Sequence, residues 1–278
     1  MCQLCVSNQS FWRGRRGFLL AAGAAAATPV LAQVDVGKGS RAAGLVPAEE
    51  IEAASAQQYS QLLAEAKSKG ALAPENNPSL QKIRAIAQRM IPQGLRFNER
   101  ARSWRWEVNL IGSKEINAFC MPGGKIAFFT GLLEQLKLTE DEAAMVMGHE
   151  MAHALREHAR ARVAKEEGTN VAIGLVTQLF GLGQLGQMGA NLGAQLLTLR
   201  WSRADESEAD LVGLEIGARA GYNPDAAVSL WTKMEQVAGG SNGPAWLSTH
   251  PSGPDRLERL RQNIPKVRGL YEQAIAHR

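Results

Sequence analysis

The sequence predicts an α+β domain that is mostly helical, with a small sheet of three or more strands packed on one central helix. Apolar residues recur at helical spacing on both sides of the middle of the chain. Between residues 104 and 130 the spacing changes to two, and turn residues separate the short apolar runs. With 278 residues, 45% of them hydrophobic, the chain is long enough to bury a full core for one such domain.

The first 32 residues predict an export signal of the twin-arginine type. Arg15 and Arg16 precede the apolar residues 18–27, and the small residues at 30–32 suit signal peptidase. The apolar run is shorter than the ~20 residues of a membrane-spanning helix, although a retained N-terminal anchor is the alternative. We therefore expect a bacterial protein delivered to the periplasm, with association with the inner membrane left open.

Charge and cysteine content exclude several classes of protein. The net charge is +4, and residues 1–32 hold three arginines and no acidic residue, so the remainder carries 4 − 3 = +1. No motif combines basic and aromatic residues, and we expect no nucleic-acid partner. Cys2 and Cys5 precede the export signal, which leaves Cys120 alone in the mature chain. One cysteine cannot form an internal disulfide. Cys120 is therefore expected to be a free thiol, and free cysteines typically behave as small buried apolar residues.

Residues 33–75 are predicted to be a linker and an N-terminal helix, ahead of a domain that spans residues 76–278. Glycine and alanine are frequent in residues 33–46, which predicts a flexible linker, and a helical pattern follows over 47–69. A second amphipathic helix covers residues 80–90 and ends before Pro92. No internal repeat is present.

The predicted sheet comes next. Tryptophan, valine and leucine alternate with polar residues over 104–110, which is typical of a half-buried strand. Residues 116–119 form a second short strand. Turn residues at 121–124 then lead into a third strand over 125–130.

The central helix follows the sheet. Thr139 is a good N-cap, and Glu142 three residues later completes a capping box. We expect this helix to continue to about Lys165. Further helices are predicted over residues 201–214, over 223–237 and from 254 onward.

Residues 168–199 contain no charged residue and seven glycines. Several glutamine and asparagine residues interrupt the apolar runs, so the segment is too polar to span a membrane. A pair of loosely packed helices is one interpretation. A mobile flap over an active site, or a surface that touches lipid, is another.

The central helix carries the sequence HEMAH at residues 149–153. Residues four apart lie ~40° apart around a helix, so His149 and His153 face the same way and can bind one cation. Glu150 lies to one side, next to an open coordination position. Zinc held by three protein groups keeps a position for water and lowers its pKa to about 7, and Glu150 suits the base that takes the proton. The alternative is two ordinary helix histidines.

A third ligand is needed for such a site. Glu206 and Asp210 are also four residues apart, so one can bind zinc while the other accepts a hydrogen bond from a ligand imidazole. Glu208 points roughly opposite to them and is expected to be solvated. His158 lies ~180° from His149 on a continuous helix and is expected to face solvent.

HEMAH followed by Glu206-x-Glu208-Ala209-Asp210 resembles the zinc metalloendopeptidases that include the CAAX prenyl proteases, the heat-shock membrane protease HtpX, the mitochondrial Oma-type protease and their exported bacterial relatives. The likeness covers roughly residues 76–265 and includes the segments 117–119, 122–124, 130–132, 249–251 and 256–257. It implies a zincin fold of the gluzincin-like kind and one Zn²⁺ per chain. It also implies that Glu206 is the third ligand and that Asp210 is its neighbour in the outer shell.

The same resemblance implies further roles. His250 and Arg256 match positions near the active site and join Glu150 as candidate catalytic residues. His250 would stabilise the oxyanion that develops during acyl transfer, or occupy the fourth zinc position and hold the enzyme inactive. A turn histidine before proline is the third reading. Asn117, Ala118 and Phe119 are the candidate edge strand on which an extended substrate lies by β-augmentation.

The exported setting and the lack of long spanning helices favour the periplasmic quality-control members of this group. We therefore expect a zinc-dependent endopeptidase that hydrolyses peptide bonds of misfolded or stalled cell-envelope proteins, with Glu150 activating water. The alternative is a periplasmic chaperone or assembly factor whose metal site is latent and self-inhibited. A structural zinc site is disfavoured, because such sites normally close with four protein ligands.

Overall fold

The computed structural model describes residues 34–166, 200–238, 245–251, 253 and 255–277. The predictions for the leader (1–32) and for the uncharged segment 168–199 lie outside these residues. Within the described part of the chain, no helix combines the length and the apolar character that crossing a membrane requires.

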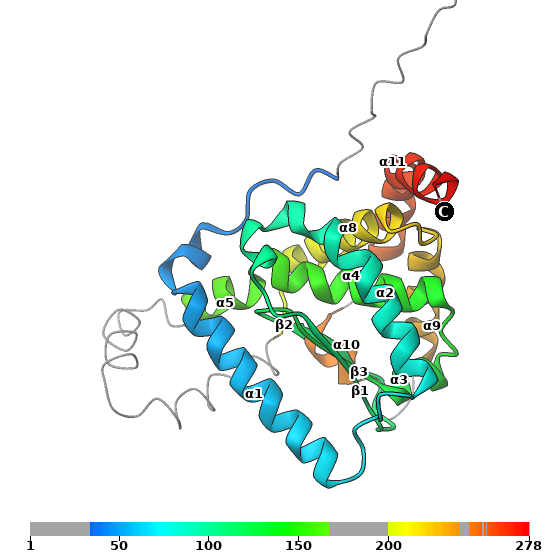
Figure 1. Ribbon diagram of the computed structural model, residues 1–278. Coiled ribbons are helices and arrows are strands. Elements are labelled where there is room, and N and C mark those ends of the chain that lie inside the picture. The colour runs from blue at the N-terminus through cyan, green and yellow to red at the C-terminus, as the bar shows by residue number, and fades with distance from the viewer. Residues whose placement is uncertain (1–33, 167–199, 239–244, 252, 254, 278) are drawn as a thin grey trace, which may run out of the picture. The chain divides into compact units, whose positions relative to one another are not determined.

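A three-stranded sheet lies at the centre of the domain (Figure 1). Its strands are β1 (Glu107–Ile111), β2 (Ala118–Met121) and β3 (Lys125–Phe129), in the order β1-β3-β2. β3 runs parallel to β1 and antiparallel to β2, so β2 is an edge strand. The predicted sheet of three short strands is confirmed.

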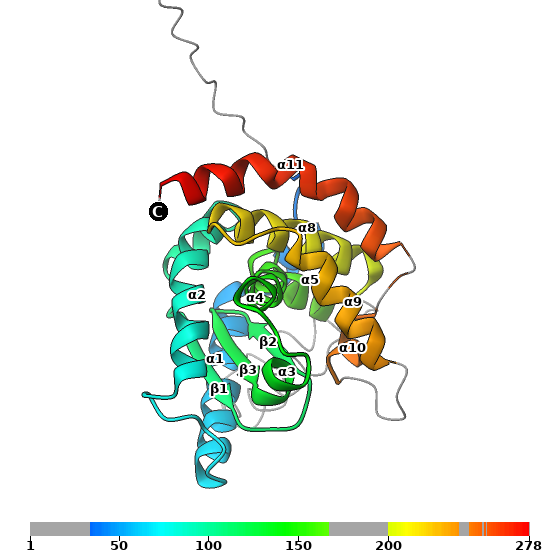
Figure 2. The same cartoon turned by 90° about the vertical axis from the view of Figure 1, so that its right-hand side faces the viewer.

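Helices cover both faces of this sheet. As a result, every residue of the central strand β3 is buried. Ile126 and Phe128 join the main core, and Ala127 and Phe129 join a second apolar cluster on the opposite face. Helix α1 (Ala48–Ser68) lies on that second face, where the hydroxyl of Tyr59 donates a hydrogen bond to the carbonyl of Ile126. Helix α4 lies on the other face, as the two views in Figures 1 and 2 show.

Helix α2 (Pro78–Gly94) begins at the N-cap Asn77, whose side chain accepts hydrogen bonds from the next turn. Its apolar face packs against α4 and β1. The other short elements are α3 (Thr130–Gln135) and the 3-10 helices η1 (Arg41–Leu45), η2 (Leu95–Phe97) and η3 (Glu99–Arg102).

Helix α4 (Glu140–Leu155) starts with the predicted capping box. The Thr139 hydroxyl accepts from the Glu142 N–H at 3.2 Å, and the Glu142 carboxylate accepts from the Thr139 N–H at 2.8 Å. The prediction that this helix continues to Lys165 is wrong. The helical path is interrupted at Glu157, which has a left-handed φ of 56°. A new helix, α5 (His158–Glu166), begins directly afterwards.

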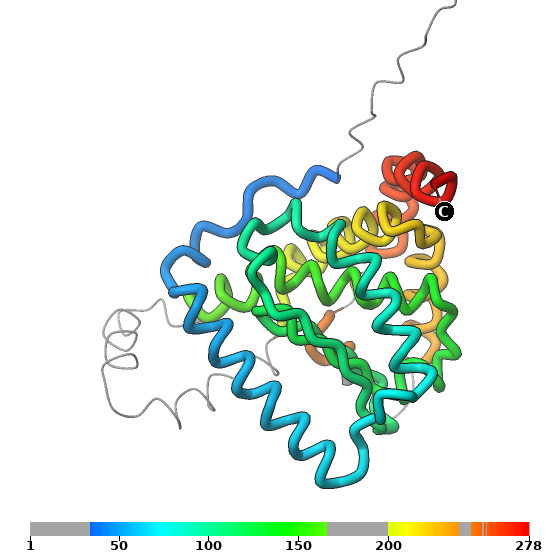
Figure 3. The backbone as a smooth tube through the Cα atoms, in the orientation of Figure 1, coloured from blue at the N-terminus to red at the C-terminus, as the bar shows by residue number. Residues whose placement is uncertain are grey.

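Helix α8 (Arg203–Arg219) crosses α4 at a very close approach. A Cβ atom on Gly213 would lie 2.6 Å from the backbone nitrogen of His149, and one on Gly148 would lie 2.7 Å from the carbonyl oxygen of Gly213. Only glycine fits at this crossing. The remaining helices are α9 (Ala226–Ala238), α10 (Ala245–Thr249) and α11 (Arg256–Ala276), and the path through them can be followed in Figure 3.

Residues 34–46, which the sequence predicts as a flexible linker, instead make defined contacts with the domain. Val34 is 2% exposed, and its N–H donates to the carboxylate of Glu215 at 2.7 Å. Glu215 is fully buried on α8 and also pairs with Arg96 and Arg219. The composition of this segment gave no sign of the contact between Val34 and Glu215, because the two residues are 181 positions apart in the sequence. The domain boundary at residue 76 stays a prediction.

Candidate active site

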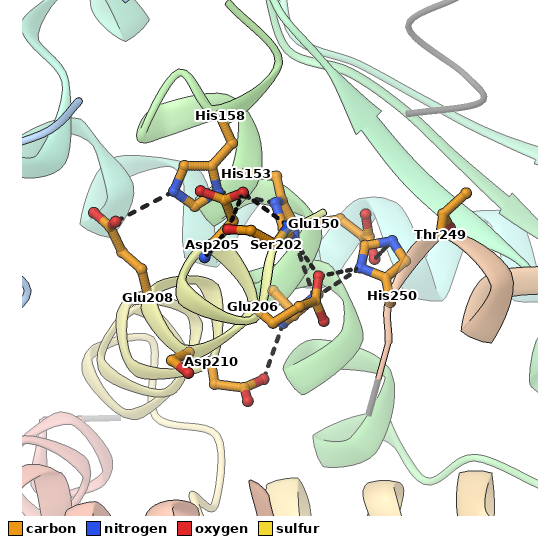
Figure 4. Close-up of polar contacts among 12 residues, drawn as sticks. Glu150, His153, His158, Ser202, Asp205, Glu206, Glu208, Asp210, Thr249 and His250 are labelled. Atoms are coloured by element: carbon orange, nitrogen blue, oxygen red, sulfur yellow. Dashed lines mark hydrogen bonds and ion pairs between the residues drawn. The ribbon is translucent and has the colours of Figure 1, made fainter. Parts of the chain in front are cut away.

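Four buried side chains from three parts of the chain meet at one point. They are His149 and His153 of α4, Glu206 of α8 and His250, which follows α10. One ligand atom from each lies within 4.8 Å of all the others, and none of the four residues is more than 3% exposed. Figure 4 shows Glu206 and His250 turned toward each other beside His153.

The spacing of these atoms suits a tetrahedral metal ion. His149 Nε2 lies 3.1 Å from both His153 Nε2 and His250 Nδ1, and Glu206 Oε1 lies 3.3 Å from His153 Nε2. Ligands bound at about 2.0–2.1 Å around tetrahedral zinc are about 3.3 Å apart. Imidazole nitrogens with a carboxylate oxygen are also the donors that zinc prefers, so the residues present fit the metal.

The surroundings of two ligands favour the protonation states that bind a metal. Burial lowers the pKa of His153 well below its ordinary value, which keeps this imidazole neutral. Burial alone would raise the pKa of Glu206, but His149, His153 and His250 outweigh it and lower that pKa far below its ordinary value. Glu206 is therefore an anionic carboxylate within the cluster.

Asp210 lies beside the imidazole of His149. Its Oδ1 is 3.0 Å from Nδ1 of His149, which leaves Nε2 of that ring free for the metal. Arg256 is 2% exposed and bridges the two carboxylates of α8, donating to Glu206 and to Asp210 at 2.7 Å each. The catalytic role that the sequence suggests for Arg256 stays a prediction, and the contacts seen for its guanidinium include both Glu206 and Asp210.

Glu150 lies beside the cluster without belonging to it. Its carboxylate accepts a hydrogen bond from the indole N–H of Trp246 at 2.6 Å and is 3.6 Å from Nε2 of His250. Burial raises the pKa of Glu150 above its ordinary value. A carboxylate with a raised pKa next to a metal position is suited to take up and return a proton.

Two sequence predictions near the cluster are wrong. His158 is 3% exposed and its Nδ1 lies 2.9 Å from Nδ1 of His153, although it was expected to face solvent. Glu208 was expected to be solvated, but its side chain is 22% exposed and pairs with Arg156 and His158. The cause is the left-handed Glu157, which ends α4 and turns His158 back toward the metal ligands.

Two tryptophans of the site were missed. Trp246 stacks on His250, with ring centroids 4.7 Å apart, and Trp201 stacks on His153 at 4.4 Å. Both tryptophans stand within four residues of a candidate site residue or of the helix that carries one, but this proximity alone was too weak a signal.

The predicted substrate strand lies at the sheet edge. Ala118 and Phe119 open the edge strand β2, and Asn117 immediately precedes it. Helix α10 lies next to this edge. The N–H of Trp246 on α10 donates a hydrogen bond to the carbonyl of Ile116 at 3.2 Å. Cys120 of the same strand is buried as predicted, and burial raises the pKa of its thiol.

An HExxH helix packed on a small sheet, with a glutamate from a following helix in the same cluster, defines the zincin-like metalloproteases. The chain belongs to Peptidase family M48, whose family model matches residues 78–264. Members of this family depend on zinc, which agrees with the donor set described above.

Several relatives share this region. The chain is 37% identical over 157 residues to the mitochondrial metalloendopeptidase OMA1 of Arabidopsis thaliana, which covers 56% of this chain and 31% of that protein. It is 27% identical over 203 residues to the metalloprotease LoiP of Escherichia coli, covering 72% and 76%. It is 28% identical over 175 residues to the β-barrel assembly-enhancing protease of Escherichia coli, covering 59% and 36%. The chain thus spans about a third of the length of the plant OMA1 protein.

Proposed function

We propose that this protein is a zinc-dependent endopeptidase. The observation that carries the proposal is the cluster of His149, His153 and Glu206 at tetrahedral spacing, with Glu150 beside it. Bound there, zinc would lower the pKa of a water molecule and polarise a peptide carbonyl. His149, His153 and Glu206 are the residues that would hold it.

The remaining side chains divide the other tasks. Glu150 accepts a proton at its carboxylate and returns it to the leaving amine, and its raised pKa suits both steps. Asp210 fixes the ring of His149, and Arg256 holds the carboxylates of Glu206 and Asp210 in place. An extended substrate would add to the edge strand β2 along Asn117, Ala118 and Phe119.

We further propose that the substrates are misfolded or stalled proteins of the cell envelope and that the enzyme acts in the periplasm. The twin-arginine pattern of residues 1–32 supports export. The name of the β-barrel assembly-enhancing protease of Escherichia coli links that relative to β-barrel assembly, and transmembrane β-barrels are proteins of the bacterial outer membrane. Association with the inner-membrane surface would place the enzyme near stalled substrates.

Glu150→Gln tests the peptidase function. This change keeps the size of the side chain and the three metal ligands but removes the base. We expect hydrolysis of an unfolded reporter protein to fall about 10²–10⁴-fold, while the zinc content stays at one ion per chain. Glu134→Gln, at an exposed position on α3, is the matched control. Equal hydrolysis by the Glu150→Gln variant would contradict the proposal.

A second candidate is a latent, self-inhibited form that acts as a chaperone or assembly factor. The position of His250 favours it, because its Nδ1 lies 3.0 Å from Glu206 and 3.1 Å from His149, where a fourth metal ligand would lie. Trp246 of the same segment binds Glu150 and the carbonyl of Ile116. One short segment thus engages the ligands, the base and the end of the substrate strand.

His250→Ala separates the two roles of this histidine. If His250 blocks the metal, its removal raises hydrolysis of the unfolded reporter. If it stabilises the oxyanion, its removal lowers hydrolysis about 10²–10³-fold. Zinc content is measured in parallel, so that loss of the metal is not mistaken for loss of the oxyanion contact.

A further inference from the structure

His158 is a buried histidine that the proposed mechanism does not use. It begins α5, is 3% exposed and sits directly behind the metal ligand His153. Only the left-handed conformation of Glu157 brings it there. A left-handed φ at a glutamate is uncommon and costs conformational energy, which the surrounding contacts must offset.

The contacts of His158 form a chain that leads away from the metal cluster. Nδ1 of His158 lies 2.9 Å from Nδ1 of His153, and Nε2 of His158 lies 3.4 Å from Oε2 of Glu208. Glu208 in turn accepts a hydrogen bond from the guanidinium of Arg156. Figure 4 shows His158 between His153 and Glu208, with the pairing to Glu208 drawn as a dashed line.

Hydrogen-bond chemistry then fixes where each proton lies. When Nε2 of His153 binds the metal, the proton of this neutral ring is on Nδ1, where it faces Nδ1 of His158. Nδ1 of His158 must therefore accept, so its own proton is on Nε2. That nitrogen lies 3.4 Å from Oε2 of Glu208, so the carboxylate acts on the ring through an electrostatic contact rather than a hydrogen bond.

The two histidine ligands thus differ in what supports them. His149 donates directly to the carboxylate of Asp210 at 3.0 Å. Among the described residues, the hydrogen-bond partner of Nδ1 of His153 is a second imidazole, that of His158. Trp201 stacks on the ring of His153 and closes the remaining side, with an interplanar angle of 22°.

We propose that His158 is a positioning residue that fixes the metal-binding tautomer of His153 and passes the polarising effect of Glu208 to it. This inference rests on the proposed role of His153 as a metal ligand. The relay holds Nε2 of His153 unprotonated and aimed at the cluster, as Asp210 does for His149. Groups that orient ligand histidines in this way typically change metal affinity 10–100-fold when they are removed.

Zinc affinity of matched variants tests the proposal. His158→Phe keeps a ring in the same place but removes the acceptor, and we expect its zinc dissociation constant to rise at least about 10-fold. His158→Gln offers an amide oxygen to His153 and an amide N–H to Glu208, so it should recover most of that loss. His277→Phe makes the same change at an exposed histidine at the end of α11 and should bind zinc like the unchanged protein. Unfolding of the zinc-free variants shows whether each one folds.

Nitrogen-15 NMR of the zinc-loaded protein provides a second test, which needs no variant at the site. The signals of the chain's five histidines are few enough to resolve, and His158→Gln removes one of them for assignment. We expect His158 to be a neutral ring with its proton on Nε2. A ring protonated on Nδ1, or on both nitrogens, would overturn the proposal. So would a folded His158→Phe variant with zinc affinity within twofold of the unchanged protein.

These measurements separate failure of the inference from failure of the proposed function. If reporter hydrolysis does not depend on Glu150 but the zinc and NMR results hold, the peptidase function fails and the relay stands. If hydrolysis depends on Glu150 and His158→Phe binds zinc normally, only the relay fails.

Discussion

Arg256 shows how much one buried side chain can contribute to a metal site without touching the metal. Its guanidinium donates to both Glu206 and Asp210 and lies 3.2 Å from the ring centroid of Trp231. Two carboxylates so close together repel each other, and one cation between them offsets that repulsion. Its planar fork reaches both at once, which the point charge of a lysine cannot do.

Arg256→Met tests this role at the scale of the residue. Methionine keeps apolar contact with Trp231 but leaves the two carboxylates without their cation. We expect the zinc-free protein to lose about 3–5 kcal/mol of stability in urea unfolding, because buried charges remain unpaired. Arg256→Lys should recover only part of this loss. A methionine variant as stable as the unchanged protein would show that Arg256 is not needed to hold Glu206 and Asp210.

The residues of the site were predictable to the extent that they share a helix. His149 with His153, and Glu206 with Asp210, lie on common faces because helical spacing alone brings them together. His158 was not predictable in this way, because one left-handed residue changes the direction of the chain. The sequence around Glu157 contains no signal that predicts the left-handed conformation, because this conformation depends on contacts with other elements.

At the scale of elements, the crossing of α4 and α8 sets the distance between the ligand pairs. Gly148 and Gly213 meet there, next to His149, and no side chain separates the two backbones. Gly213→Ala would put a methyl group 2.6 Å from a backbone nitrogen, so the helices must move apart. We expect a loss of about 1–3 kcal/mol of stability and weaker zinc binding, since Glu206 moves away from His149.

The matched control is Gly269→Ala on α11, where an added Cβ meets nothing within 4 Å. That change should stabilise the protein by about 0.5–1 kcal/mol, because alanine favours a helix over glycine. Equal behaviour of the two variants in unfolding and in zinc titration would refute the importance of the crossing.

The capping residue Glu142 at the start of α4 should make the stability of the protein depend on pH. Burial alone would raise the pKa of Glu142, but hydrogen bonds from Lys233, from the Thr139 backbone and from Ser229 lower it below its ordinary value. A carboxyl group with a lowered pKa in the folded state adds stability above its unfolded pKa and loses it as pH falls through the folded one. The protein should therefore exceed Glu142→Gln in stability by about 1–3 kcal/mol at pH 7.

That advantage should disappear as the pH falls from about 5 to below the folded pKa, when Glu142 itself becomes neutral. Unfolding curves of both proteins across this range provide the measurement, with Glu134→Gln on α3 as the exposed comparison. A stability difference that stays constant down to the lowest pH would show that packing, not charge, accounts for the role of Glu142. The capping box itself was predictable from Thr139 and Glu142, whereas Lys233 and Ser229 come from α9 and were not.

At the scale of the whole molecule, the metal cluster joins side chains from three segments that are far apart in the sequence. α4, α8 and Trp246 of α10 all contribute to the main core, and a hydrogen bond from the N–H of Trp201 to the carbonyl of Thr249 adds a link to the segment that carries His250. An ion bound by side chains from these separate segments stabilises only the folded chain. Zinc should therefore raise the stability of the entire domain, not merely of the active site.

Free zinc at about 1,000 times its dissociation constant should add about 4 kcal/mol, or roughly 10 °C in the unfolding temperature of a domain of this size. Glu150→Gln keeps the ligands, so calorimetry should show the same rise in a protein that no longer hydrolyses peptides. Glu206→Gln removes the anionic ligand and should lose most of the rise. Because stability and hydrolysis then respond to different residues, the pair of variants separates metal binding from catalysis. A full rise in Glu206→Gln would mean that the zinc is bound elsewhere.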